Sequence, residues 1–171
     1  MRLHILRRRG GTWLERMVAI ILIGIFVAVF LGRMLFYQEY AEKTAMELTV
    51  ENIRTGLRYQ TADLMLANRM SEIPTLADKN PINWLAERPA NYLGELDSAP
   101  ADEPKGQWYF DKRSWELVYT VNNRRHFESP DGRDYSVRYR ATRQTSGSDR
   151  GAPRVETWVS FAPVREYRWQ P

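Results

Sequence analysis

The side chains that catalysis requires are scarce in this sequence. Its 171 residues include no cysteine and only two histidines, His4 and His126, so neither a disulfide framework nor a thiolate metal site can form. The patterns HExxH, GxGxxG and G-x-S-x-G and the phosphate-binding P-loop do not occur. Carboxylates are plentiful, but Glu15 alone lies in an apolar setting. We therefore expect a protein that is not an enzyme and that carries no cofactor or metal.

Glu15 stands just before an apolar segment. The chain from Met17 to Gly32 is a run of about sixteen residues without a charge. Extension past Arg33 to Tyr37 gives the roughly 20 residues needed to cross a bilayer, and Arg33 is long enough to reach the far headgroups. The cluster Arg7-Arg8-Arg9 predicts that the N-terminus stays in the cytoplasm.

This segment has three interpretations: a secretory signal peptide, a plain signal anchor, and an anchor that assembles with others. Bulky residues follow the apolar run, in the sequence LGRMLFYQEYAEK, and they do not suit a signal-peptidase site. A carboxylate in lipid costs about 2.5–3.5 kcal/mol on insertion scales, and a plain anchor gains nothing from Glu15. An anchor whose carboxylate meets a positive charge within a helix bundle does gain, so Glu15 favours the third interpretation.

The residues around Glu15 form a recognisable motif. The sequence from Gly10 to Gly24 resembles the prepilin motif G-FTLIELMVVIAIIG of the type IV pilin and type II secretion pseudopilin family. The match is without gaps at Gly10, Thr12, Glu15, Met17, Val18, Ile20, Ile23 and Gly24. Gly11 stands where the family usually has Phe, and Arg16 stands where it has an apolar residue.

The resemblance implies a specific maturation and assembly. A prepilin peptidase would cut after Gly10 and methylate the new amine of Gly11. Glu15, then the fifth residue, would pair with the N-terminal amine of a neighbouring subunit as the helix leaves the membrane. The α-amino group is cationic near neutral pH, and an unpaired charge is costly in low dielectric, so this pairing would select the axial register.

The resemblance also names partners and a location. The partners would be prepilin peptidase, other pilins or pseudopilins, an inner-membrane assembly platform and membrane lipid. The protein would cross the bacterial inner membrane once, with a periplasmic C-terminal domain, and would enter a secretion pseudopilus or a pilus. The alternatives are a bitopic inner-membrane protein that does not polymerise and a minor pilin that binds DNA.

Two glycines interrupt the apolar segment, Gly24 and Gly32. Glycine is a weak helix former, and two explanations remain open. Small residues allow helices to pack closely in membranes. Alternatively, Gly32, where many pilins carry Pro, lets the helix stretch during assembly.

Apolar periodicity continues beyond the membrane segment. No proline occurs from Thr12 to Ile73, so we expect a helix over roughly residues 12–70, about 85–90 Å long at 1.5 Å per residue. One predicted stripe on it is Ala41, Ala45, Leu48 and Asn52, and the apolar packing positions are Val50, Ile53, Leu57, Leu64 and Met65. We expect Glu39 to be exposed and to pair with Lys43.

The sequence that follows the long helix predicts a small helix and a sheet. Asn80-Pro81 is a helix-start signal, and the turn-rich stretch from Asp97 to Gly106 lacks the ligand spacing of a calcium loop. Strand periodicity predicts an antiparallel meander of about four strands. Its inward alternations are Trp115, Leu117, Tyr119 and Val121; Tyr135, Val137, Tyr139 and Ala141; and Val155, Thr157, Val159 and Phe161.

The predicted fold class is therefore α+β, with a long N-terminal helix packed on a small antiparallel sheet. The predicted parts are a leader peptide at 1–10, a transmembrane helix at 11–37, an amphipathic helix at 38–72 and a periplasmic domain at 73–171.

Charge distribution bears on the DNA alternative. The net charge is +4, and loss of residues 1–10 removes Arg2, Arg7, Arg8 and Arg9 without removing an acid. A basic face remains conceivable at Arg124, Arg125, Arg138, Arg140 and Arg143, but nearby acids balance it. We therefore do not expect nucleic acid as a partner, and we interpret His126, which follows Arg125, as part of a solvated turn.

Overall fold

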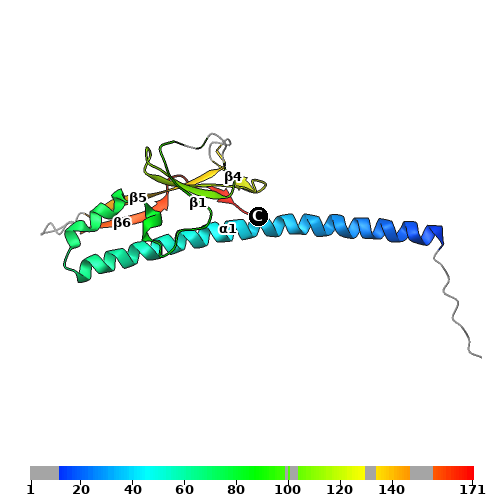
Figure 1. Cartoon of the computed structure of the whole chain (residues 1–171), viewed down its shortest axis with the longest axis horizontal. Coiled ribbons are helices and arrows are strands. Elements are labelled where there is room, and N and C mark those ends of the chain that lie inside the picture. The colour runs from blue at the N-terminus through cyan, green and yellow to red at the C-terminus, as the bar shows by residue number, and fades with distance from the viewer. Residues whose placement is uncertain (1–11, 99, 101–103, 130–133, 147–155) are drawn as a thin grey trace, which may run out of the picture. The chain divides into compact units, whose positions relative to one another are not determined.

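The computed structural model is an α+β fold and describes residues 12–98, 100, 104–129, 134–146 and 156–171. Helix α1 comprises Trp13–Leu66 and is followed by the 3-10 helices η1 (Met70–Asp78) and η2 (Pro81–Trp84). The strands are β1 (Tyr92–Leu96), β2 (Gln107–Asp111), β3 (Glu116–Thr120), β4 (Phe127–Glu128), β5 (Ser136–Ser146), β6 (Glu156–Pro163) and β7 (Arg168–Trp169) (Figure 1). The predicted class, with one long N-terminal helix, is confirmed.

Helix α1 contributes to two compact units of the chain, Met1–Gln38 and Glu39–Pro171. Its end is set by Asn68, which adopts a left-handed backbone conformation with φ 58°. The amide of Arg69 donates to the carbonyl of Leu64, and the amide of Asn68 donates to that of Met65. This pair of bonds is the Schellman motif, which satisfies the last carbonyls of a helix.

Five strands form the main sheet of the second unit, in the order β1-β2-β3-β5-β6. The pairs β2–β3, β3–β5 and β5–β6 are antiparallel, whereas β1 runs parallel to β2. Strands β4 and β7 pair separately as a two-stranded antiparallel sheet. The predicted meander of about four antiparallel strands corresponds to β2, β3, β5 and β6, but the prediction missed β1, which makes the main sheet mixed, and the separate β4–β7 pair.

Strand β1 was not predicted because its sequence, YLGEL, is short and shows no regular alternation of apolar and polar residues. Gly94 has φ +115°, a conformation that breaks the alternation of side chains and favours glycine. The register between β1 and β2 also shifts between Tyr92 and Glu95.

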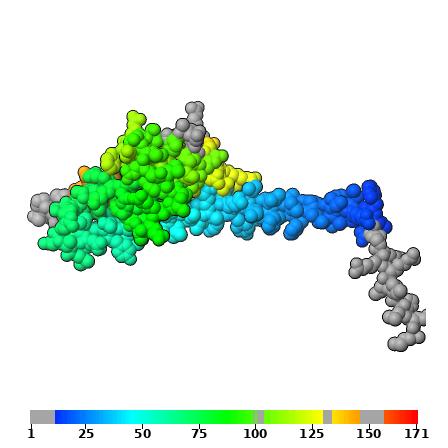
Figure 2. All heavy atoms as spheres, viewed as in Figure 1, coloured from blue at the N-terminus to red at the C-terminus, as the bar shows by residue number. Residues whose placement is uncertain are grey.

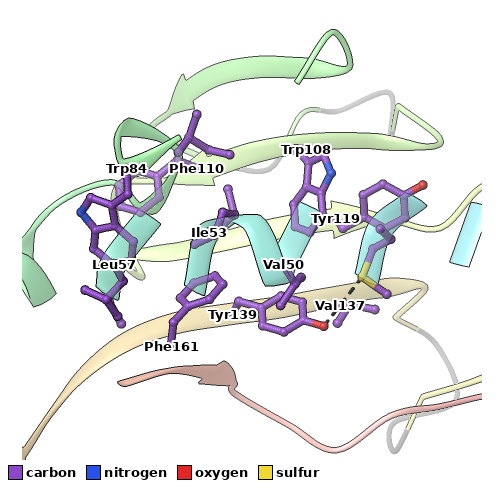
Figure 3. Close-up of a cluster of buried hydrophobic side chains, with 14 of the residues drawn as sticks. Val50, Ile53, Leu57, Trp84, Trp108, Phe110, Tyr119, Val137, Tyr139 and Phe161 are labelled. Carbon is purple, nitrogen blue, oxygen red and sulfur yellow. Dashed lines mark hydrogen bonds between the residues drawn. The ribbon is translucent and has the colours of Figure 1, made fainter. Parts of the chain in front are cut away.

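The core of the second unit lies between α1 and the five-stranded sheet (Figure 3). Helix α1 contributes Met46, Val50, Ile53 and Leu57, and the sheet contributes Trp108, Phe110, Leu117, Tyr119, Val137, Tyr139 and Phe161. Aromatic rings pack against one another here, with ring centres of Trp108 and Tyr119 4.8 Å apart. Trp115 and Tyr135, expected on the inward face, are exposed instead; Trp115 lies in the β2–β3 turn with φ 56°.

Helix η2 packs directly on α1, and Gly56 permits the contact. The predicted cap is confirmed, since the Asn80 side chain accepts a hydrogen bond from the amide of Ile82 and Pro81 begins the helix. A β-carbon at Gly56 would lie 2.3 Å from the carbonyl oxygen of Trp84. In the space-filling view, the green atoms of the η2 and β1 region are massed over the second half of α1, Glu39–Leu66 (Figure 2).

Candidate functional site

The predicted processing site and the predicted assembly carboxylate differ in what the structure describes. Gly10 and Gly11 lie outside the described residues. Glu15 lies in the first turn of α1 and is exposed. An acid in this position is compatible with the positive end of the helix dipole.

Residues 13–38 of α1 carry exposed side chains over their whole length. They include large apolar groups such as Phe26, 71% exposed, and Ile23, 62% exposed. Helix α1 is, by length and composition, a helix that could cross a membrane. A β-carbon at Gly24 or Gly32 would have no neighbour within 4 Å, so neither glycine is required by packing inside this unit.

A second helix face, on residues 39–66, is exposed and uncharged. Its residues recur alternately every four and every three positions, which is the spacing of a coiled-coil seam. They are Ala41, Ala45, Leu48, Asn52, Thr55, Tyr59, Ala62 and Leu66, all exposed, with Leu48 60% and Tyr59 69% exposed. The predicted stripe from Ala41 to Asn52 is thus the beginning of a longer seam that points away from the core.

Sequence reasoning missed a buried carboxylate, Glu39. The prediction that Glu39 is exposed and pairs with Lys43 was wrong, because Glu39 is 2% exposed and Lys43 lies 3.9 Å from Glu47. The Glu39 carboxylate accepts from the His126 amide at 2.9 Å and from the Trp169 indole Nε1 at 3.1 Å. Its other oxygen lies 2.8 Å from His126 Nδ1.

Glu42, one turn further along α1, anchors the connection after β3. Its carboxylate accepts from the amide of Asn122 at 2.6 Å, the amide of Asn123 at 3.0 Å and the hydroxyl of Tyr119 at 3.1 Å. It also accepts from the Asn123 side-chain amide at 2.9 Å. Glu39 and Glu42 together attach two segments of the sheet region to the helix, and we call them the carboxylate clamp.

The contacts of the two carboxylates shift the pKa of Glu39 and that of Tyr119, the neighbour of Glu42. Burial raises the pKa of Glu39, but the hydrogen bonds from His126 and Trp169 outweigh it, and the net pKa is below the ordinary value of 4.5. Burial, together with the charge of Glu42, raises the pKa of Tyr119. Glu39 is therefore an anion at neutral pH and Tyr119 a neutral donor.

A signal for Glu39 was present in the sequence. Glu39 precedes Met46 by seven residues, and the buried positions Val50, Ile53 and Leu57 continue the same spacing. Glu39 therefore occupies a core-facing position of the helix period, and a carboxylate there needs buried donors. His126 lies in the predicted turn, and its side chain is 41% exposed, but its ring nitrogen contacts Glu39.

Three of the five arginines that were considered as a basic face, Arg138, Arg140 and Arg143, have carboxylate partners. Arg140 lies 2.6 Å and Arg138 3.4 Å from Glu116, which is buried. Arg143 pairs with Asp78, and the Arg124 guanidinium lies 4.2 Å from the centre of the Tyr135 ring. Among the described residues, this part of the sheet is a network of paired charges.

An open groove of about 400 Å³ lies between α1 and β6. Its apolar lining includes Leu57, Met65, Trp158 and Phe161, and Arg54 donates to the Phe161 carbonyl at 3.2 Å. Within the described chain, no group of three His, Asp or Glu side chains is placed to hold a metal ion. The groove is an apolar surface with two arginines, Arg54 and Arg58.

Comparison of this chain with protein-family models, with curated proteins and with solved structures finds no match.

Proposed function

We propose that this chain is a pilin-like structural subunit. It would be inserted in the bacterial inner membrane by the first half of α1, cut after Gly10, and assembled into a secretion pseudopilus or a type IV pilus. The observation that carries the proposal is Glu15, an acid in the first turn of a long helix whose first half is apolar, five residues after Gly10.

The physical role proposed for Glu15 is selection of register. Where water is excluded, a carboxylate and an ammonium group are both costly unless each meets the other. The new amine of Gly11 would supply the positive charge for Glu15 of a neighbouring subunit. Only one axial offset between two helices brings the two groups together, so the ion pair would fix that offset.

The seam on residues 41–66 supports assembly through the helix. Its alternating spacing of four and three residues is the pattern with which helices pack side by side. The absence of charge along it means that covering the seam desolvates no ionised group. A helix that crosses a membrane as a plain anchor has no need of such a face outside the bilayer.

The test is substitution of Glu15 in the full chain, expressed with its native assembly machinery. For Glu15→Leu, we expect normal membrane insertion, measured by resistance to carbonate extraction, and at least a tenfold loss from the sheared filament fraction. Glu15→Asp retains the charge and is expected to retain part of the incorporation. Glu51→Leu, which removes an exposed acid from the same helix, is the control and should reduce neither membrane insertion nor incorporation into filaments.

Wild-type incorporation of Glu15→Leu would contradict the proposal. Absence of the wild-type chain from filaments, with normal insertion, would favour the bitopic protein that does not polymerise.

A further inference from the structure

The Glu39 half of the clamp joins three segments that are distant in sequence. Glu39 lies on α1, His126 directly precedes β4, and Trp169 ends β7. The carboxylate is almost completely buried, at 2% exposure, and all three of its close contacts come from the β4–β7 region. This side chain therefore makes a polar connection between α1 and the two-stranded sheet.

The contacts require a carboxylate in its charged form. An ionised carboxylate only accepts hydrogen bonds, and Glu39 meets the backbone N–H of His126 and the indole N–H of Trp169, which only donate. The His126 ring can donate through Nδ1, and a protonated imidazole always does. If Glu39 also gains a proton, its O–H faces the Nδ1–H of the imidazolium, and two donors compete for one position.

Apart from the Glu39 bonds, strands β4 and β7 are attached by aromatic packing, since Phe127 and Trp169 are buried in the core of the second unit. Each strand is two residues long. The two strands are joined by the Phe127 and Trp169 rings, whose centres lie 5.6 Å apart, and by a bond from the Gln170 amide to the His126 carbonyl. The Tyr167 and Tyr139 hydroxyls lie 2.9 Å apart. The five-stranded sheet includes neither strand, so the pair can open without breaking it.

The other charged groups on these elements are occupied or lie at the surface. Glu42 holds Asn122 and Asn123, Lys43 pairs with Glu47, and Arg168 lies 3.8 Å from Glu128. Arg124 stacks on Tyr135, and Arg125 is exposed. His126 is the one titratable group that the described contacts place on the Glu39 carboxylate.

We propose that Glu39 and His126 form a proton-operated latch, which holds the β4–β7 pair on α1 while Glu39 is ionised and releases it when both groups are protonated. The latch lies within Glu39–Pro171 and does not depend on the proposed filament function.

The lowered pKa of Glu39 sets the direction of the pH dependence. Since the folded pKa is below 4.5, the latch is fully closed above that pH and opens as the pH falls through the folded value. The five-stranded sheet, which does not rely on Glu39, should persist through this opening.

The test is fluorine NMR of the full chain in detergent micelles, with fluorotryptophan at all tryptophans. Trp169 reports on the latch and the buried Trp108 on the five-stranded sheet, each assigned by a Trp→Phe variant. In the wild type, the Trp169 signal should change below pH 4.5 while that of Trp108 does not. Simultaneous change of both signals would overturn the proposal, because it would mean that the unit unfolds as a whole.

Glu39→Gln removes the negative charge that the His126 and Trp169 donors meet, at every pH. A neutral imidazole can accept from the glutamine amide, whereas an imidazolium cannot. The Trp169 signal of this variant should therefore show the open state at pH values at which the wild type is still closed, with the opening midpoint raised by more than one pH unit. Glu42→Gln, on the neighbouring turn, should leave the Trp169 midpoint unchanged, and an unchanged midpoint in Glu39→Gln would contradict the latch.

His126→Gln provides an independent measurement if Glu39→Gln does not fold. Removal of the imidazole takes away the positive charge that stabilises the Glu39 anion, while the amide can still donate one hydrogen bond. The Trp169 signal should then change at a higher pH than in the wild type. A midpoint equal to that of the wild type would show that His126 is not part of the latch.

Discussion

The two halves of α1 place their apolar side chains in opposite situations. In residues 13–38, every side chain is exposed, including Phe26 and Ile23. In residues 39–66, one face buries Met46, Val50 and Ile53, and the opposite face is the uncharged seam. One continuous helix thus has a first half without a core and a second half that helps to build one.

This difference shows that an apolar helix segment is not necessarily buried within its own unit. The second half buries its apolar face against the sheet of the same unit. The remaining faces of this half can therefore contact water. The first half has no such cover within its own unit, and its length and composition are those of a helix that could cross a membrane. A residue in one half should therefore respond to substitution differently from its counterpart in the other.

Ile53 tests the comparison with the largest expected effect. Ile53 is fully buried, and Ile53→Ala should lower the free energy of unfolding of the second unit by about 2–5 kcal/mol through lost burial and a cavity. Urea unfolding of the full chain in detergent, followed by tryptophan fluorescence, measures it. Leu48→Ala, on the seam of the same half, should change it by less than about 0.5 kcal/mol, and equal effects would contradict the assignment of faces.

The glycines of the two halves provide a second contrast. Gly56→Ala forces a β-carbon against the Trp84 carbonyl, which should destabilise the second unit by about 1–3 kcal/mol despite the better helix propensity of alanine. Gly24→Ala meets no atom within 4 Å and should leave the unfolding midpoint unchanged. Tolerance of Gly56→Ala would show that η2 does not pack so closely on α1.

Glu42 gives the smallest of the three effects. Glu42→Ala leaves the Asn122 and Asn123 amides without their acceptor, and the expected loss is about 1–2 kcal/mol because water reaches this partly exposed site. Hydrogen exchange of these two amides should accelerate accordingly. Glu47→Ala removes an exposed partner of Lys43 and should have almost no effect, so comparable protection loss in both variants would contradict the clamp.

The sequence predicted those elements whose periodicity is regular and local. Leu117, Tyr119, Val137, Tyr139 and Phe161 belong to the buried core, as the alternation predicted. Strand β1 was missed because Gly94 interrupts its alternation and because its parallel partner follows a long connection. The β4–β7 pair was missed because two-residue strands have no period to detect.

The site residues divide in the same way. Glu15 is conspicuous in the sequence because a charge next to an apolar run is unusual. Glu39 is not, since an acid on an amphipathic helix usually faces water, and its donors His126 and Trp169 lie 87 and 130 positions further along the chain. Such a contact depends on the tertiary fold. In the sequence, only the position of Glu39 in the helix period indicated that it faces the core.

The maturation of the N-terminus tests the central claim most directly. Intact-mass spectrometry of the membrane-extracted protein measures it without any substitution. The account predicts a chain that lacks residues 1–10 and begins at Gly11 with one added methyl group. A chain that still begins at Met1 and retains Arg7, Arg8 and Arg9 would contradict it.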